Sequence, residues 1–138
     1  MDAAQAIADL TEISSQIESV VLLDGKGAVA GSTFPDAGPA TRFADAAKAL
    51  LDAAESLREG GEPLTQLEAE TPEGSVFVLR EGDRLIAATT VPDPTVGLVF
   101  YDLKSALRVA ADAEDAKPKR KPRARAPKKA TKAAKDDA

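Results

Sequence analysis

Residues 17–34 read IESVVLLDGKGAVAGSTF, and the pattern of this stretch decides the class of fold. An apolar run at 20–23 leads into the residues DGKG at 24–27, after which small and β-branched residues continue to Phe34. Two short apolar segments joined by a turn that contains glycine are typical of a β-hairpin, because glycine readily adopts a positive φ. The stretch therefore predicts two antiparallel strands.

Helices are expected on both sides of this hairpin. Isoleucine and leucine recur at about helical spacing between Ile7 and Ile17, which predicts an amphipathic helix over residues 2–16. A second helix is expected to begin with Thr41 as its N-cap and to continue to the glycine pair at Gly60.

The second half of the chain predicts a three-stranded meander and a last helix. Strands are expected over residues 64–71, 75–80 and 84–90, separated by tight turns that contain glycine. Apolar side chains then step by three or four positions over residues 95–112, which favours a helix over a sixth strand. The order α-β-β-α-β-β-β-α indicates an α+β fold, a five-stranded antiparallel sheet with helices packed on it.

This order resembles that of roadblock-type domains, and particular residues carry the resemblance. They are IESVVLLD at 17–24 before the Gly-Lys-Gly turn, the apolar helix after Phe43, the meander, and TVGLV at 95–99. The similarity covers about residues 1–112 and implies a roadblock/profilin-like architecture.

The resemblance also implies a kind of function, that of a homodimeric binding platform. Members of the family pair through the second helix and an adjoining edge strand, and several bind small Ras-like GTPases or larger motor and kinase assemblies. Some bacterial members raise the GTPase rate of their partner. The family implies no cofactor and has no fixed catalytic residue, so the resemblance transfers architecture and no active site.

The composition restricts the chemistry open to this chain. It contains no Cys, His or Trp, which excludes disulfides, catalysis by thiolate or imidazole, and zinc sites with Cys or His ligands. Gly25, Gly27 and Gly31 precede a predicted strand with the spacing G-x-G-x-x-x-G, which differs from the dinucleotide-binding fingerprint. A P-loop motif is also absent from the sequence, so the protein is not itself expected to be a P-loop NTPase.

The second helix has an unusually wide apolar face. Its apolar residues span an arc of about 220°, roughly twice the stripe that one sheet face covers. We therefore expect its large residues to face the sheet and its small ones to allow another helix close. Alanine is also simply a strong helix former, and that is the alternative explanation. The large residues expected against the sheet are Phe43, Leu50, Leu51 and Leu57. The predicted dimer interface consists of Ala46, Ala49, Ala53 and again Leu50. A solvated acidic face is expected to hold Asp45, Asp52, Glu55 and Glu59.

Charge divides the chain into two parts. Residues 1–116 hold 8 Lys and Arg against 21 Asp and Glu, a net charge of −13, whereas residues 117–138 hold 10 against 2, a net charge of +8. The basic segment has no large apolar residue, so we expect a domain over 1–112 and a disordered tail over 113–138. The tail is expected to contact a polyanion such as DNA without sequence preference; a solubilising arm is the alternative. The candidate polyanion-binding residues are Lys117, Lys119, Arg120, Lys121, Arg123, Arg125, Lys128, Lys129, Lys132 and Lys135.

Three classes of function follow, in order of preference. The first is a non-enzymatic homodimeric scaffold or regulator of a small GTPase or similar signalling partner, and the second is a nucleoid-associated protein that binds DNA through its tail. An enzyme comes last, because no nucleophile with its base is recognisable. No cofactor or metal is expected. The start of the sequence does not resemble a secretory signal, and the sequence contains no apolar run of membrane-spanning length. A bacterial cytoplasmic protein is therefore expected.

The tail hypothesis predicts a steep dependence of DNA binding on salt. If about six tail cations meet phosphates, the affinity should fall with a log-log salt slope near −5, and duplexes of different A·T content should compete almost equally. Titration of the full-length protein against labelled duplexes at increasing salt measures both. A flat salt response would contradict DNA binding by the tail.

Overall fold

The order of elements predicted from the sequence is confirmed by the computed structural model, which describes residues 2–58 and 60–116. Three helices and five strands follow one another as expected. The elements are α1 (Ala3–Ile13), β1 (Ile17–Leu23), β2 (Val29–Ser32), α2 (Ala37–Glu55), β3 (Gln66–Thr71), β4 (Gly74–Glu81), β5 (Arg84–Thr90) and α3 (Val96–Ala116).

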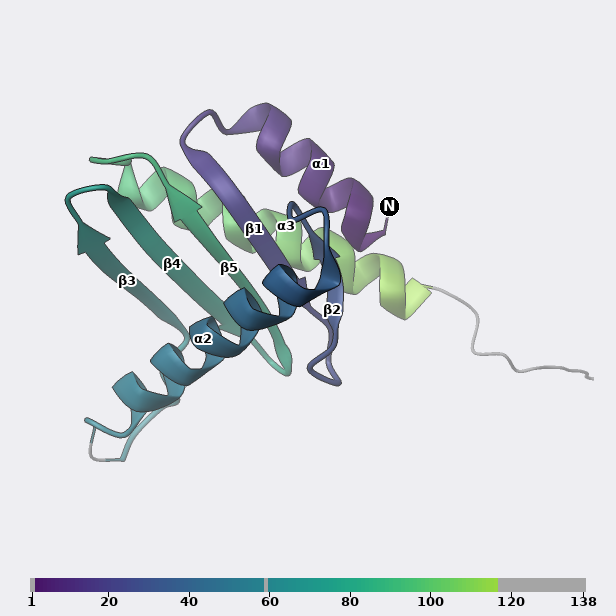
Figure 1. The fold of residues 1–138 in the computed structure, drawn as a ribbon. Coiled ribbons are helices and arrows are strands. Elements are labelled where there is room, and N and C mark those ends of the chain that lie inside the picture. Colours follow the sequence, from purple (N-terminus) through teal and green to yellow (C-terminus); the bar gives the residue numbers. More distant parts are fainter. Residues whose placement is uncertain (1, 59, 117–138) are drawn as a thin grey trace, which may run out of the picture.

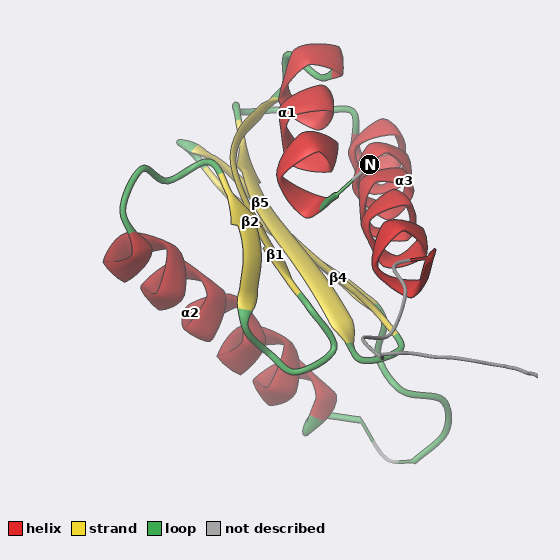
Figure 2. Cartoon of the chain, turned by 90° about the vertical axis from the view of Figure 1, so that its right-hand side faces the viewer, coloured by secondary structure: helices red, strands yellow, loops and turns green. Residues whose placement is uncertain are grey.

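The five strands form one antiparallel sheet in the order β2-β1-β5-β4-β3. Pairing of β1 with β5 joins the first hairpin to the last strand of the meander, so β1 lies inside the sheet although it comes first along the chain. Helices α1 and α3 lie on one face and α2 on the other (Figure 2). Helix α2 crosses its face obliquely, from beside β2 toward the start of β3 (Figure 1). The sheet is therefore covered on both faces.

Strand β1 shows why both faces are covered. Successive side chains of a strand point to opposite faces. Val20 and Leu22 belong to the core beneath α1 and α3, whereas Val21 and Leu23 belong to the core beneath α2. All four are buried. An uninterrupted apolar run is typical of a strand that is buried on both sides.

The predicted hairpin turn between β1 and β2 is confirmed in its details. The Asp24 carboxylate accepts hydrogen bonds from the backbone N–H groups of Lys26, at 2.8 Å, and Ala28, at 3.1 Å. Gly27 has a φ of 83°, which explains why glycine is needed there. The turn is thus closed by one carboxylate and one glycine.

The limits of α2 differ from those predicted. The helix begins at Ala37, so Thr41 lies inside it and the prediction of Thr41 as N-cap is wrong. Pro39 is tolerated because the N–H groups of the first helical turn have no intrahelical acceptor. The helix also ends at Glu55, before Gly60.

The last segment is a helix, as the three-and-four spacing predicted, and it runs to Ala116 rather than ending near residue 112. Its start is held by the loop between α1 and β1. The backbone N–H of Thr95 donates to Gln16 Oε1 at 2.6 Å, and that of Val91 donates to the Gln16 carbonyl at 2.9 Å. Gln16 therefore positions the entry into α3.

Replacement of Gly74 should test the pairing of β4 with β5. This glycine has a φ of 151°, and an added Cβ would lie 2.0 Å from the Thr90 carbonyl oxygen. We expect Gly74→Ala to lower the free energy of unfolding by about 3 kcal/mol, measured by urea denaturation. Gly82→Asn is the matched control: its φ is 62° with nothing near the added Cβ, so it should cost under about 1 kcal/mol. Equal losses would contradict the close approach at Thr90.

Candidate protein-binding surface

Helix α2 divides its wide apolar arc between the sheet and solvent. Ala40, Ala44, Ala47 and Leu51 are buried against the sheet. The opposite flank of the apolar arc is exposed, and it holds all the residues of the predicted dimer interface. We call it the α2 flank; its residues are Ala46, Ala49, Leu50 and Ala53.

Two of the large residues expected against the sheet lie elsewhere. Leu50 is 36% exposed and Leu57 is 85% exposed, so their predicted contact with the sheet is wrong. Leu50 lies on the same side of the helix as the alanines of the α2 flank, and Leu57 follows the end of the helix. Leu51 is buried as predicted, and Phe43 is half-buried with its ring centroid 5.5 Å from that of Phe34. Leu50 is therefore the large apolar side chain of the α2 flank.

An arginine on β4 holds the C-terminal end of α2. Arg80 donates to the Leu64 carbonyl at 2.8 Å and to Glu55 Oε1 at 3.4 Å, and its guanidinium is 3.8 Å from Asp52. Glu55 also accepts from the Leu64 N–H at 2.5 Å. The prediction that Glu55 belongs to a solvated face is therefore wrong, because its half-buried carboxylate joins α2 to the loop that leads into β3.

The acidic face of α2 is otherwise as expected, since Asp45 and Asp52 are exposed. Glu59 lies outside the described residues. Sequence spacing could not reveal the contact of Arg80 with Glu55, because 25 residues separate them. The C-terminal end of the α2 flank is thus anchored by a tertiary interaction.

The edge strand β3 lies beyond β4 and pairs only with it. Its alternation leaves Gln66, Glu68 and Glu70 exposed, whereas Leu67 and Ala69 are half-buried. The edge is open to pairing with another strand, and its charged residues guard against non-specific association.

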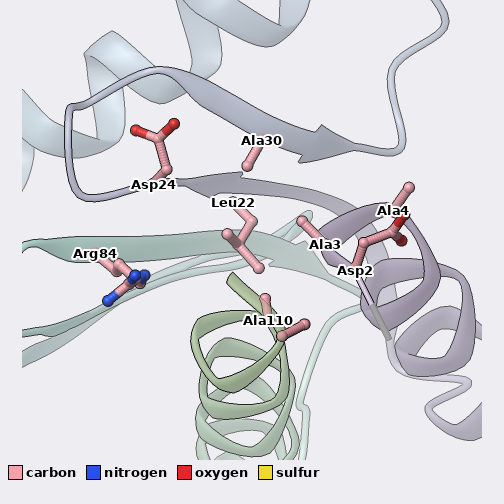
Figure 3. A pocket seen from close by; sticks show the side chains of 9 residues that line it. Asp2, Ala3, Ala4, Leu22, Asp24, Ala30, Arg84 and Ala110 are labelled. Carbon is pink, nitrogen blue, oxygen red and sulfur yellow. The ribbon is translucent and has the colours of Figure 1, made fainter. Parts of the chain in front are cut away.

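A cavity of about 310 Å³ opens where the start of α1, the β1–β2 turn and α3 come together (Figure 3). Its charged lining residues are Asp2, Asp24 and Arg84, and its floor includes Leu22 and Ala110. Asp2 caps α1 by accepting from the Gln5 N–H, and Asp24 closes the hairpin turn. Both carboxylates thus have structural roles, and the lining contains no nucleophile paired with a base.

The ionisable groups whose pKa is shifted belong to α3 and to the end of β4. Arg108 donates to both oxygens of Glu81 on β4, at 2.8 to 3.2 Å. The hydrogen bond from Arg108 lowers the pKa of Glu81, and the same bond raises the pKa of Arg108. Burial raises the pKa of Asp102. The first two groups form a structural ion pair, which links α3 to the sheet.

Several expectations concern other parts of the chain or other kinds of site. All ten candidate polyanion-binding residues, from Lys117 to Lys135, lie outside the described residues. Within 2–58 and 60–116, acidic side chains form no group of three that could hold a metal ion. In the same part of the chain, none of the helices combines the length and apolarity needed to cross a membrane.

Comparison with known proteins identifies the fold. No family model and no curated protein matches the chain. A crystal structure of a Roadblock/LC7 domain from Streptomyces avermitilis is 19% identical, has a TM-score of 0.72, and aligns over 83% of this chain and 99% of that chain. MglB of Myxococcus xanthus is 17% identical, with a TM-score of 0.61, over 85% of this chain and 88% of that chain. A further MglB structure is described as having a tetrameric arrangement. It is 18% identical, has a TM-score of 0.67, and aligns over 83% of this chain and 90% of that chain.

These similarities place the chain in a structural class: three helices on a five-stranded antiparallel sheet, with α2 alone on one face. The chain has the Roadblock/LC7 fold, as its sequence pattern predicted.

Proposed function

We infer that this protein is a non-enzymatic homodimeric regulator or scaffold that binds a small Ras-like GTPase. The observation that carries the inference is the α2 flank, a row of small and apolar side chains left exposed on a helix that already has a buried face. The fold supports it, because roadblock-type domains are expected to pair through this helix and to bind small GTPases. The absence of a P-loop from the sequence is consistent with a protein that regulates a nucleotide-binding partner.

The proposed dimer places two α2 flanks against each other. Alanine side chains allow two helices to pack at the short end of the usual interaxial range of 8–10 Å. Ala46, Ala49 and Ala53 would form the line of closest approach, and Leu50 would be buried beside it. A two-fold axis makes such an interface self-complementary. The edges of two β3 strands would then lie near the seam and extend it.

Two further considerations support this choice of surface. A solved MglB with this fold is described as having a tetrameric arrangement, so the architecture is compatible with self-association. Leu50 adds a large apolar side chain to the α2 flank, and an apolar patch on a soluble protein commonly marks a protein interface. The alternative, DNA binding, rests on the tail alone, whereas the α2 flank belongs to the described fold.

Charged substitutions on the α2 flank should weaken the dimer. Ala49→Glu and Ala53→Glu each place a carboxylate where two helices would meet, and we expect the dimer dissociation constant to rise at least tenfold. Analytical ultracentrifugation at micromolar concentrations measures it, and circular dichroism checks that the fold is retained. Thr11→Glu, which adds the same charge at an exposed position of α1, should leave the dimer intact. A wild-type protein that stays monomeric at high concentration would contradict the proposal.

Binding of a GTPase should depend on its nucleotide. We expect full-length protein to bind a Ras-like GTPase of its own organism, with affinities for the GDP-bound and GTP-analogue-bound forms that differ at least fivefold. Isothermal titration calorimetry with each purified GTPase in each state measures this, and phosphate release reports any change in GTP hydrolysis. Failure of every such GTPase to bind, while the dimer forms normally, would separate the partner hypothesis from the dimer hypothesis and reject the former.

A further inference from the structure

A groove between α1 and α3 lies on the face of the sheet opposite to α2, where the two helices run side by side (Figure 2). Its volume is about 350 Å³. Leu10 and Ala106, which belong to the core beneath these helices, form part of its floor. The groove is therefore a depression between two helices that are themselves anchored to the sheet.

The rim of this groove is unusually apolar for a surface. Ile13 on α1 is 75% exposed, and across the groove Tyr101 and Val109 on α3 are 68% and 37% exposed. These three side chains lie around one depression, unlike apolar residues scattered singly over a surface, which need no explanation. A depression between two packed helices has the shape that accepts a third helix, ridge into groove.

The charges that line the groove all have one sign. Among its lining residues, only Asp9 and Asp102 carry a charge at neutral pH, and both are carboxylates. Asp9 accepts a hydrogen bond from the Gln5 side-chain amide at 2.9 Å. Among residues 2–58 and 60–116, neither carboxylate forms an ion pair with a cation, and burial raises the pKa of Asp102.

The cations of α3 do not compensate this charge. Arg108 pairs with Glu81 on β4, and Lys104 acts on the same carboxylate. Helix α1 contains no Lys or Arg at all. The groove is thus apolar with two carboxylates that lack a countercharge within the described fold.

The apolar rim and the two carboxylates restrict what kind of partner can fill the groove. A second copy that paired through the same face would bring Asp9 and Asp102 against their own equivalents, and like charges at short distance repel. The basic segment 117–138 supplies cations but no large apolar residue to cover Ile13 and Tyr101. An occupant that satisfies both features carries apolar and cationic side chains on one helix.

We propose that the α1–α3 groove is a docking site for a basic amphipathic helix of another protein. Apolar residues of that helix at i, i+3, i+4 and i+7 fill the depression beside Tyr101 and Val109, and flanking Lys or Arg side chains meet Asp9 and Asp102. The site lies on the opposite face from the α2 flank. It therefore operates whether or not α2 forms a dimer, and it gives the protein a second binding face.

Tyr101 provides a reporter at the site itself. It is the only tyrosine of the chain, which has no tryptophan, so tyrosine emission reports on the groove. The probe is an 18-residue Leu/Lys peptide with apolar residues at helical spacing and no aromatic residue, added to full-length protein. We expect a saturable change in Tyr101 emission at micromolar peptide, and no change with the matched Leu/Glu peptide or with a scrambled Leu/Lys peptide that cannot form an apolar face.

Variants separate the groove from the general acidity of the protein. Asp9→Asn/Asp102→Asn should weaken binding of the Leu/Lys peptide at least about fivefold, and Val109→Glu should weaken it about tenfold or more. Glu73→Gln/Asp83→Asn removes the same two charges from exposed turns of the sheet, and it should change the affinity less than twofold. Circular dichroism melts confirm that each variant is folded.

Several outcomes would overturn the proposal. One is an equal loss of affinity in the control double variant, which would indicate non-specific attraction to an acidic surface. Another is the same emission change with a synthetic peptide of residues 117–138, which would make the chain's own tail the occupant. A shift of Val109→Glu toward monomer in sedimentation would make the groove an interface between copies. Absence of any saturable emission change with the Leu/Lys peptide would leave no helix-binding site.

Discussion

The burial of β1 on both faces is the constraint from which the rest of this structure follows. Val20 and Leu22 on one side and Val21 and Leu23 on the other are inaccessible to water. One layer of helices cannot cover both sides of a strand, so the chain places α1 and α3 on one face and α2 on the other. Pairing with β2 and β5 then satisfies both backbone edges of β1. Removal of either helical layer would expose half of this apolar run.

Unequal coverage of the two faces produces the surfaces available for binding. Two helices share one face and leave a groove between them, whereas the single helix α2 covers the other and presents its flank to solvent. Alanine at 40, 44 and 47 brings α2 close to the sheet with little side-chain bulk. Leu50 is exposed on the α2 flank together with the alanines, and Leu57, just after the end of the helix, is exposed as well. Both candidate surfaces are consequences of how three helices divide over two faces.

Electrostatic contacts act mainly at the boundaries of elements. Arg80 joins the end of α2 to the loop before β3, and Arg108 joins α3 to the end of β4 through Glu81. Both pairs are partly or largely exposed, so each contributes little stability by itself. Their effect is to hold the C-terminal end of α2 and the body of α3 against β4.

Local patterns in the sequence determined the order of elements, the β1–β2 turn and the helical character of residues 96–112. These features depend on side-chain period and on the special φ of glycine, both of which act between near neighbours. The α2 flank was also recognisable, because the wide apolar arc is a property of one helix. Tertiary structure alone decided the rotation of α2, which turned Leu50 outward, and the contact of Glu55 with Arg80. It also decided the groove, since Ile13 on α1 and Tyr101 on α3 lie 88 positions apart in the sequence. Such contacts depend on how helices settle on a sheet, and no local spacing in the sequence encodes that.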